Sequence, residues 1–489
     1  MDYVLYAALA APVLTGAGIF AAPSGVAAGR ITLTGSVLTA LLLFTLAWQV
    51  MVGGPLHKGH LYVDELSAVL LTVIALLTIT AALFSLQYME REVEDEANKD
   101  DILKRYYALF TVFTLSMITV PIVENLGLMW VTVEATTLSS ALLVAFTFSR
   151  AAIEAAWKYV MICTVGLCLA LLGTILLYFA QINTGPAAGE ALSWLALQQV
   201  GDRLDPHMVK IAFVFIIIGY GAKVGLSPMH TWLPDAHSQA PSPVSGLLSG
   251  VLLSCALYVI MRNIAIIKGT AAFLFVQQLL IGLGLFSVLM VIPFLLAQHD
   301  IKRLLAYSSV EHMGIVTLAL GISTPMAVYG ALLHIFNHAV VKSALFYMAG
   351  IITQEYRTKQ MMRIRGLLSS KPRLGSAFLL FALIITGAPP FGIFFSKLII
   401  TYAAFAGGFP LIGTVLLLLL GAVFAGMIYY CFQMLFSASA GHAETQRPVG
   451  FSATLALTLS VLLITLTGLY LPAFFEAALR QAAALVAGG

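Results

Sequence analysis

Three ionisable side chains recur at intervals of four residues within one long apolar stretch, residues 330–350. The stretch reads GALLHIFNHAVVKSALFYMAG and carries His334, His338 and Lys342. Residues four apart lie about 40° apart around a helix and about 6 Å apart along it, so the three side chains form one slowly winding column. Neutral imidazole donates a hydrogen bond through one ring nitrogen and accepts one through the other. The spacing therefore suits stepwise proton transfer along one helix face.

Four further charged residues also lie inside apolar runs, namely Glu134, Lys158, Lys223 and Lys397. A charge in hydrocarbon costs about 3 kcal/mol on insertion scales, so we expect these groups to face one another or water. A Lys–Glu pair whose separation changes can load and release a proton. Two alternatives stay open: Lys158, near the start of its run, could snorkel to the interface, and Glu134 could form a purely structural ion pair.

A metal site is the weaker interpretation of the two histidines. Imidazoles four residues apart can bind zinc, but no third ligand and no HExxH pattern follows them. The four cysteines lie in apolar runs and form no CxxC pair, so neither a zinc site nor an iron–sulfur cluster is indicated. There is no GxGxxG after a strand and no haem signature, so we expect no cofactor in this chain.

The composition places these charges in a polytopic membrane protein. Of 489 residues 60% are hydrophobic and only 10% are charged, whereas a soluble protein is about a quarter charged. The first apolar run has no basic segment ahead of it, which favours a first span over a cleaved signal peptide. Pro472 to Val486 is too short and mixed to span. Breaks at charged, proline and glycine residues predict about fourteen spans: 3–22, 31–52, 66–89, 106–123, 125–148, 155–180, 208–226, 242–265, 272–298, 302–321, 326–353, 375–403, 410–437 and 451–471.

Lysine and arginine are concentrated in the loops that follow odd-numbered spans, above all in residues 90–105 and 355–373. These loops are ordinary interfacial segments or docking surfaces for a soluble partner. By the positive-inside rule this side is cytoplasmic. With an even number of spans both termini then lie outside a bacterial or archaeal cytoplasmic membrane.

Two spans contain helix-breaking residues beside a lysine. GYGAKVGLSPMHTWLPDAHSQAPSPVSG places Lys223 among glycines and prolines in span 7, and ITGAPPFGIFFSK places Lys397 after a similar break in span 12. Breaks at matching places in two halves indicate inverted repeats with ion sites at the midplane. We therefore predict an all-α fold divided into 1–105, a first five-helix repeat 106–265 (spans 4–8), a second repeat 266–437 (spans 9–13), and 438–489.

Other histidines flank these breaks. His230 and His237 could link a half-channel to the cytoplasm, or could simply line a polar re-entrant loop. In QHDIKRLLAYSSVEHMGI, residues 299–303 are typical of a solvated cytoplasmic turn, whereas Glu311 and His312 lie deeper. Of these two, His312 is the better candidate for a central relay, with a structural histidine as the alternative.

The sequence resembles the antiporter-like membrane subunits shared by respiratory complex I, Mrp cation/proton antiporters and group 4 membrane-bound hydrogenases. The resemblance covers roughly residues 60–440. It rests on VEATTLSSALLVA, GAKVGLSPMHTWLPDAHSQAPSPVSGLLSGVLLSCALY, QHDIKRLLAYSSVEHMGI, HIFNHAVVKSALFYMAG and GAPPFGIFFSK. Within that superfamily the second and third stretches look most like hydrogenase-4 component F and its relatives in formate-hydrogenlyase-type complexes.

The resemblance implies roles for the buried charges. It implies Glu134 and Lys223 as an input-side pair that Lys158 bridges or leaves. It also implies a connecting axis of His334, His338 and Lys342. Lys397 would lie near the exit.

One position departs from the family pattern. Where relatives often carry a lysine or histidine in span 8, this chain has Ser254, whose hydroxyl can pass a proton through water but cannot hold a positive charge. The central link would therefore be water-mediated or interrupted.

The favoured function is a proton-translocating subunit of a membrane-bound hydrogenase or formate-hydrogenlyase-like complex. Its partners would be other membrane subunits, a soluble redox arm that holds a NiFe centre and iron–sulfur clusters, and membrane lipids, with no nucleic acid. The alternatives are a Mrp-type cation/proton antiporter subunit and an energy-coupling membrane partner in inorganic-carbon uptake.

Overall fold

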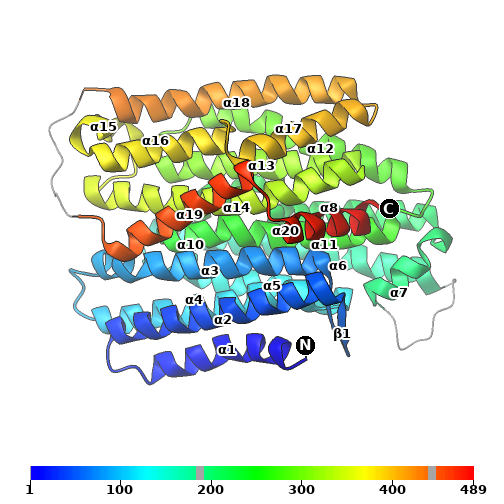
Figure 1. Cartoon of the computed structure of the whole chain (residues 1–489), viewed down its shortest axis with the longest axis horizontal. Coiled ribbons are helices and arrows are strands. Elements are labelled where there is room, and N and C mark those ends of the chain that lie inside the picture. Colours follow the sequence, from blue (N-terminus) through cyan, green and yellow to red (C-terminus); the bar gives the residue numbers. More distant parts are fainter. Residues whose placement is uncertain (1, 183–191, 439–447, 489) are drawn as a thin grey trace.

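The computed structural model describes residues 2–182, 192–438 and 448–488. These residues are almost entirely helical, and the helices run side by side along one direction (Figure 1). Two short strands, β1 (Leu56–Lys58) and β2 (Leu61–Val63), pair as an antiparallel hairpin. The helices are α1 (Asp2–Phe20), α2 (Gly25–Gly53), α3 (Glu65–Glu92), α4 (Lys99–Thr119), α5 (Leu126–Val144), α6 (Arg150–Ile182), α7 (Trp194–Gln199), α8 (Pro206–Val224), α9 (Trp232–Gln239), α10 (Ser242–Leu247), α11 (Leu253–Ile267), α12 (Phe273–Leu296), α13 (Ile301–Ile322), α14 (Pro325–Tyr356), α15 (Leu367–Ser370), α16 (Pro372–Thr386), α17 (Gly392–Ala406), α18 (Pro410–Phe436), α19 (Phe451–Leu469) and α20 (Ala473–Ala487).

Thirteen segments of the described residues are long and apolar enough to cross a bilayer. The predicted twelfth span, 375–403, instead forms two shorter apolar helices, α16 and α17. The thirteen long segments and this interrupted pair together confirm the predicted all-α fold of about fourteen spans. The last helix, α20, is one of the shorter ones and packs against α3 and α14.

The fourth span begins earlier than predicted. The prediction starts it at residue 106, but α4 starts at Lys99. Asp100 and Asp101 occupy its first turn, where their carboxylates interact favourably with the positive end of the helix dipole. Asp100 also accepts a hydrogen bond of 2.7 Å from the backbone nitrogen of Gly25 and so joins α4 to the start of α2. The charged stretch is therefore partly helix rather than loop.

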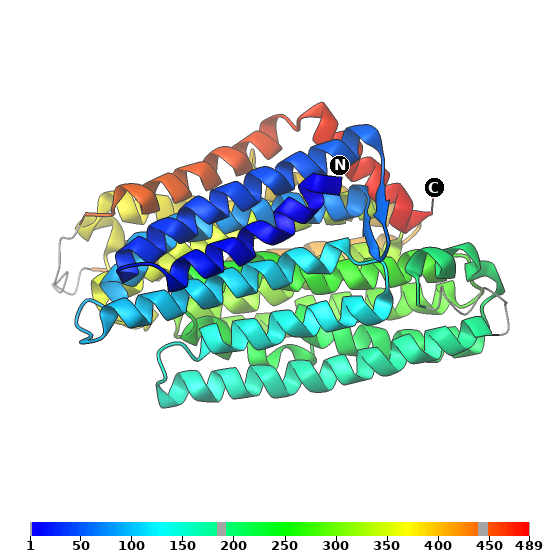
Figure 2. The same ribbon diagram turned by 90° about the horizontal axis from the view of Figure 1, so that it is seen from below.

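Helix α14 is the central element of the bundle. It packs against α3, α10, α13, α16, α17, α19 and α20. The apolar windows of α13 and α14 are 100% buried, whereas that of α19 is 22% buried. Figure 2 shows α19 and α6 at opposite edges of the molecule. A charged side chain on α13 or α14 is therefore screened from lipid by surrounding helices.

Both predicted helix breaks are present. Helix α8 ends at Val224, and Gly225 follows with a φ of 82°. Helix α16 ends at Thr386, and Gly387 follows with a φ of 101°. Left-handed backbone of this kind is favourable only for glycine and terminates a helix. The two breaks leave Lys223 at the end of α8 and Lys397 within α17, while the inverted repeat and the four-part division of the chain remain predictions.

The N- and C-terminal ends of the chain lie at the same end of the bundle, beside the β1–β2 hairpin (Figure 1). The opposite end carries the α3–α4 connection and α15, near the basic loops. This arrangement fits an even number of spans. Which end faces the cytoplasm remains the prediction made from the basic loops.

A buried ion pair joins α3 to α11 near the hairpin end. Arg262 lies within α11 and is 1% exposed. Its two terminal nitrogens donate to the Asp64 carboxylate at 2.5 and 2.6 Å. Burial disfavours the carboxylate, but Arg262 outweighs that effect and holds the pKa of Asp64 below its ordinary value. This pair ties the start of α3 to α11.

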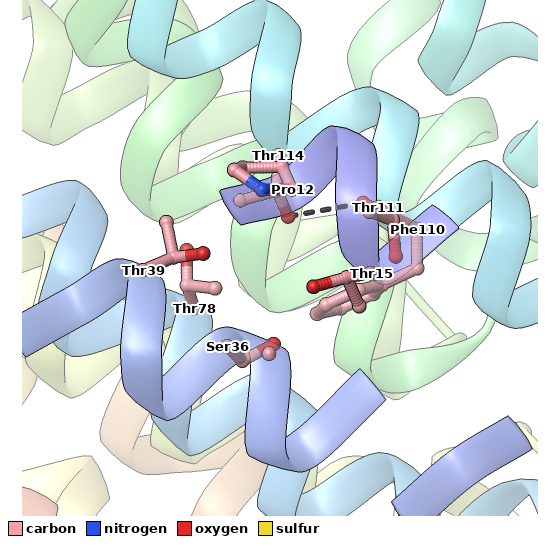
Figure 3. Close-up of a pocket in the computed structure, with 9 residues that line it drawn as sticks. Pro12, Thr15, Ser36, Thr39, Thr78, Phe110, Thr111 and Thr114 are labelled. Atoms are coloured by element: carbon pink, nitrogen blue, oxygen red, sulfur yellow. Dashed lines mark hydrogen bonds between the residues drawn. The ribbon is translucent and has the colours of Figure 1, made fainter. Parts of the chain in front are cut away.

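A small polar pocket lies among α1, α2, α3 and α4 (Figure 3). Hydroxyl groups of Thr15, Ser36, Thr39 and Thr78 line it together with two threonines of α4. Its volume of about 10 Å³ is close to what one water molecule needs. The pocket therefore suits a single structural water rather than a substrate.

Candidate functional site

Lys223 lies at the C-terminal end of α8, buried between α5 and α6. Helices α6 and α8 approach closely because Gly219 faces the backbone of Gly166, where a Cβ would come within 2.5 Å of the Gly166 carbonyl oxygen. The Lys223 Nζ donates to Thr137 Oγ1 at 2.6 Å and to the Tyr159 hydroxyl at 2.7 Å. Close helix packing thus places this ammonium against two hydroxyl groups.

Glu134 is connected to Lys223 through a threonine rather than directly. Thr137 Oγ1 donates to Glu134 Oε2 at 3.2 Å, and Thr164 donates to the other carboxylate oxygen at 2.8 Å. Thr137 therefore accepts from the lysine and donates to the glutamate. Because a hydroxyl can do both at once, it can carry a proton between the two groups.

Lys158 lies away from this pair. Its Nζ contacts Glu154 at 2.6 Å and Asp235 of α9 at 3.2 Å, and Arg303 of α13 also pairs with Asp235. Lys158 does not contact Glu134, because it lies near the start of α6 and meets the carboxylates of Glu154 and Asp235 there. The Lys158 side chain is 38% exposed, which is compatible with the alternative that it snorkels to the membrane interface.

A second charge pair lies between α13 and α17. The Lys397 Nζ is 3.0 Å from Glu311 Oε1, and the glutamate side chain is 3% exposed. The sequence interpretation assigned no role to Glu311 and preferred His312. A carboxylate deep in an apolar helix was nevertheless a signal, since such a group needs a cation nearby.

Three histidines lie in contact beside that pair. His312 Nδ1 is 2.8 Å from His334 Nε2, and the second nitrogen of His334 is 2.8 Å from Ser396 Oγ. The rings of His312 and His338 are 5.0 Å apart between centroids. Neither ring nitrogen of His338 has a hydrogen-bond partner among the described residues. The structure therefore brings His312, from α13, into the column predicted along α14.

Lys342 ends this column. Its Nζ donates to the Leu305 carbonyl at 2.5 Å and also bonds Ser308 Oγ, both on α13. The Ser309 hydroxyl bonds Ser249 Oγ at 2.8 Å across to the π-helical turn η4 (Leu248–Leu252). These serines join α13 to η4, and no feature of the sequence separated them from other serines.

Ser254, the predicted central position, bonds only within its own helix. Its hydroxyl donates to the Gly250 carbonyl at 2.9 Å. The cross-helix hydroxyl contact comes instead from Ser249, five residues earlier. The π-helical turn η4, which contains Ser249 and ends just before Ser254, alters the helical register, which simple 3.6-residue spacing could not anticipate.

His230 and His237 differ in their surroundings. His230 Nδ1 is 3.0 Å from Ser227 Oγ, and its ring contacts Phe294 and Tyr307. His237 is fully buried and stacks on Phe346 with centroids 5.0 Å apart. Its two ring nitrogens have no hydrogen-bond partner in the part of the chain that the structure describes.

A polar cavity of about 420 Å³ opens at the end of the bundle that carries the basic loops. Glu92, Gln354, Lys359 and Lys302 are among its lining residues. Lys302 was predicted to lie in a solvated turn, but it is 2% exposed and donates to the Ala240 carbonyl at 2.6 Å. Burial also lowers the pKa of Lys359, in the loop after α14. The cavity thus leads from the surface to a buried lysine.

Metal ligation is not supported within residues 2–182, 192–438 and 448–488. No group of three or more His, Cys, Asp or Glu side chains there is arranged to hold a metal ion. The histidines contact each other, serine, and the Lys397–Glu311 pair. What this arrangement can do chemically is accept, hold and pass protons.

Comparison with known proteins agrees with the sequence resemblance. A family model described as "NADH:quinone oxidoreductase/Mrp antiporter, TM" matches residues 123–425. The hydrogenase-4 component F homolog of Methylacidiphilum infernorum is 38% identical over 413 residues, which is 84% of this chain and 85% of that protein. Hydrogenase-4 component B of Escherichia coli is 30% identical over 433 residues, which is 84% of this chain and 62% of that protein.

The fold has a similar counterpart among solved structures. A chain of an archaeal membrane-bound sulfane sulfur reductase superposes with a TM-score of 0.87 at 23% identity, over 99% of this chain and 98% of that one. The stretch that matches the family model contains Glu134, Lys397 and every candidate residue between them. The chain belongs to the NADH:quinone oxidoreductase/Mrp antiporter transmembrane family.

Proposed function

We propose that this chain translocates protons through its buried charged residues as one membrane subunit of a redox-driven complex. The observation that carries the proposal is the series of approaches from Lys397 to Glu311 at 3.0 Å, from Glu311 to His312 at 4.0 Å and from His312 to His334 at 2.8 Å, with the His338 ring 5.0 Å from that of His312. All of these groups are buried on helices near the centre of the bundle. Charged and titratable groups are costly inside a membrane protein, and where they occur they mark ion or proton pathways.

The Glu134–Lys223 pair and the group formed by Lys342, the histidines, Glu311 and Lys397 would have different roles. Glu134 and Lys223, coupled through Thr137, would receive an electrostatic signal from a neighbouring membrane subunit. A change in their separation would shift the proton affinity of Lys223, because a nearby carboxylate favours the ammonium form. Lys342 and the histidines would pass the proton on, and Lys397 with Glu311 would release it.

Proton access would come from the cavity at the basic-loop end. Lys302 and Lys359 line that cavity. Lys302 donates a hydrogen bond to the Ala240 carbonyl, and His237 lies three residues before Ala240 in the chain. Both ring nitrogens of His237 are unpartnered among the described residues. Under the predicted orientation, with both termini outside, this is the cytoplasmic side of a bacterial or archaeal membrane.

The complex is most consistent with a membrane-bound hydrogenase or formate-hydrogenlyase-like assembly. Two relatives carry the name of hydrogenase-4 components, and their similarity extends over 84% of this chain in each case. A soluble redox arm in partner subunits would hold the NiFe centre and iron–sulfur clusters. This chain would supply the proton path alone.

Replacing Lys342 by alanine tests the proposal. In vesicles that contain the assembled complex, we expect Lys342→Ala to abolish redox-driven proton movement while leaving electron transfer by the soluble arm partly intact. The physical reason is that alanine has no titratable group and cannot replace the Lys342 ammonium that donates to Leu305 and Ser308. Lys104→Ala, in α4 and outside the charged clusters, is the matched control. Proton movement in Lys342→Ala equal to that of the control would remove this lysine from the path.

A Mrp-type cation/proton antiporter is the second candidate, because the matching family carries both names. It predicts sodium-dependent proton release from acidified vesicles that lack any redox partner. The buried carboxylate of Glu311 contacts a lysine rather than a cage of oxygen ligands, which favours protons over sodium. Redox-independent exchange would select this second function.

A further inference from the structure

An apolar groove runs along the outside of the bundle between α16 and α19, with α14 as its floor. Both outer helices pack on α14, and Figure 1 shows them on either side of it. The groove encloses about 870 Å³. Its walls include Met348, Leu380, Phe381 and Leu457. None of the buried charges of the proton path lines it.

The mouth of the groove is charged rather than apolar. Lys371, Arg373 and Glu355 lie there, at the end of the bundle that bears the basic loops. Glu355 is already balanced, because Lys371 pairs with it and Arg91 lies 3.8 Å away. Arg373 is exposed and makes no ion pair among the described residues. The mouth therefore keeps a positive charge available to a ligand.

The dimensions match one leaflet of a bilayer. From Lys371 at the mouth to Phe381 inside, α16 rises by about 15 Å, which is about half of the hydrocarbon thickness. Arg373 also lies in the first turn of α16, where free backbone N–H groups favour an anion. A charged mouth above an apolar cleft of this depth fits an amphiphile with an anionic head and acyl tails.

We propose that this groove is a binding site for one anionic phospholipid. The phosphate accepts hydrogen bonds from the Arg373 guanidinium at the mouth, and an acyl chain lies against Leu457 and Phe381. The lipid thereby ties α16, which precedes the helix break before Lys397, to α14 and α19. The proposal does not depend on the direction or existence of proton transport.

Lipid retention by the purified complex tests the site. The detergent-solubilised complex is equilibrated with an equimolar mixture of phosphatidylglycerol and phosphatidylcholine. It is then released from the detergent under mild conditions, and its mass is measured by native mass spectrometry. We expect one phosphatidylglycerol to stay with the native chain, and retention to fall about tenfold in Arg373→Gln, since a charge-assisted hydrogen bond of this kind is lost. Arg150→Gln, an exposed arginine at the start of α6, is the control and keeps the lipid.

A second variant separates the head from the tail. Leu457→Trp fills the groove without touching its charge, and we expect it to lose the lipid as Arg373→Gln does. Equal retention of the two lipids, retention unchanged in both variants, or a helix of a partner subunit seated in the groove of the assembled complex would each overturn the proposal.

Discussion

At the scale of single residues, every lysine in the candidate path has a partner on another helix. Lys223 meets hydroxyl groups on α5 and α6, Lys342 meets α13, and Lys397 meets Glu311. Removing one partner of a buried ion pair leaves a charge without compensation, which costs several kcal/mol. These contacts therefore stabilise the fold, and in the proposed function they would also pass a proton when the protonation state changes.

The Lys397–Glu311 pair allows a structural role to be separated from a functional one. We expect Glu311→Gln to lower the free energy of unfolding by about 3–5 kcal/mol, because Lys397 then lies buried without its counter-charge. Replacing both residues, as in Glu311→Leu with Lys397→Met, restores most of that stability but not proton movement. Thermal unfolding in detergent and proton uptake in vesicles measure the two effects. Proton uptake by the double variant would show that the pair only holds α13 and α17 together.

The buried charges could be found from the sequence, but their partners could not. Lys223, Lys342 and Lys397 stand out because they interrupt apolar runs. Which side chain meets which depends on how distant helices pack, and no local pattern reports this. For that reason the sequence left open whether Lys158 bridges to the Glu134 pair or leaves it, and it assigned no role to Glu311.

At the scale of elements, the two helix breaks position Lys223 and Lys397. Glycine and proline residues marked both breaks in the sequence, and the structure confirms them at Gly225 and Gly387. The π-helical turn η4 and the burial of Lys302 were not predicted. Both depend on neighbouring helices, because a short charged turn is solvated only where nothing covers it.

The end of α8 should be sensitive to a single methyl group. At Gly225 the φ of 82° is strained for any residue with a Cβ, which would also lie 2.4 Å from the Leu233 Cδ1. We expect Gly225→Ala to cost about 1–2 kcal/mol or more of unfolding free energy and to displace Lys223. Gly282→Ala in α12 is the control, because nothing lies within 4 Å of its added Cβ. Equal unfolding temperatures for the two variants would contradict this interpretation of the break.

At the scale of the whole molecule, the hydropathy of the sequence predicted the membrane spans. The packing of these spans brings the charged side chains together in the interior of the bundle. The apolar windows of helices α13 and α14 are 100% buried, so the charged column lies inside a shell of apolar helices. A hydrogen bond between Ser309 and Ser249 joins α13 to η4. In the proposed path, the central step would therefore depend on hydroxyl groups rather than on a cation.

His338 gives the most direct test of proton conduction. Its ring nitrogens bond no described residue, so leucine at this position removes no protein hydrogen bond and should leave stability unchanged or raised. We expect redox-driven proton uptake by vesicles with His338→Leu to fall about tenfold or more relative to electron transfer, because a titratable relay is lost. Uptake equal to that of the native complex, at an unchanged unfolding temperature, would contradict a proton path through this column.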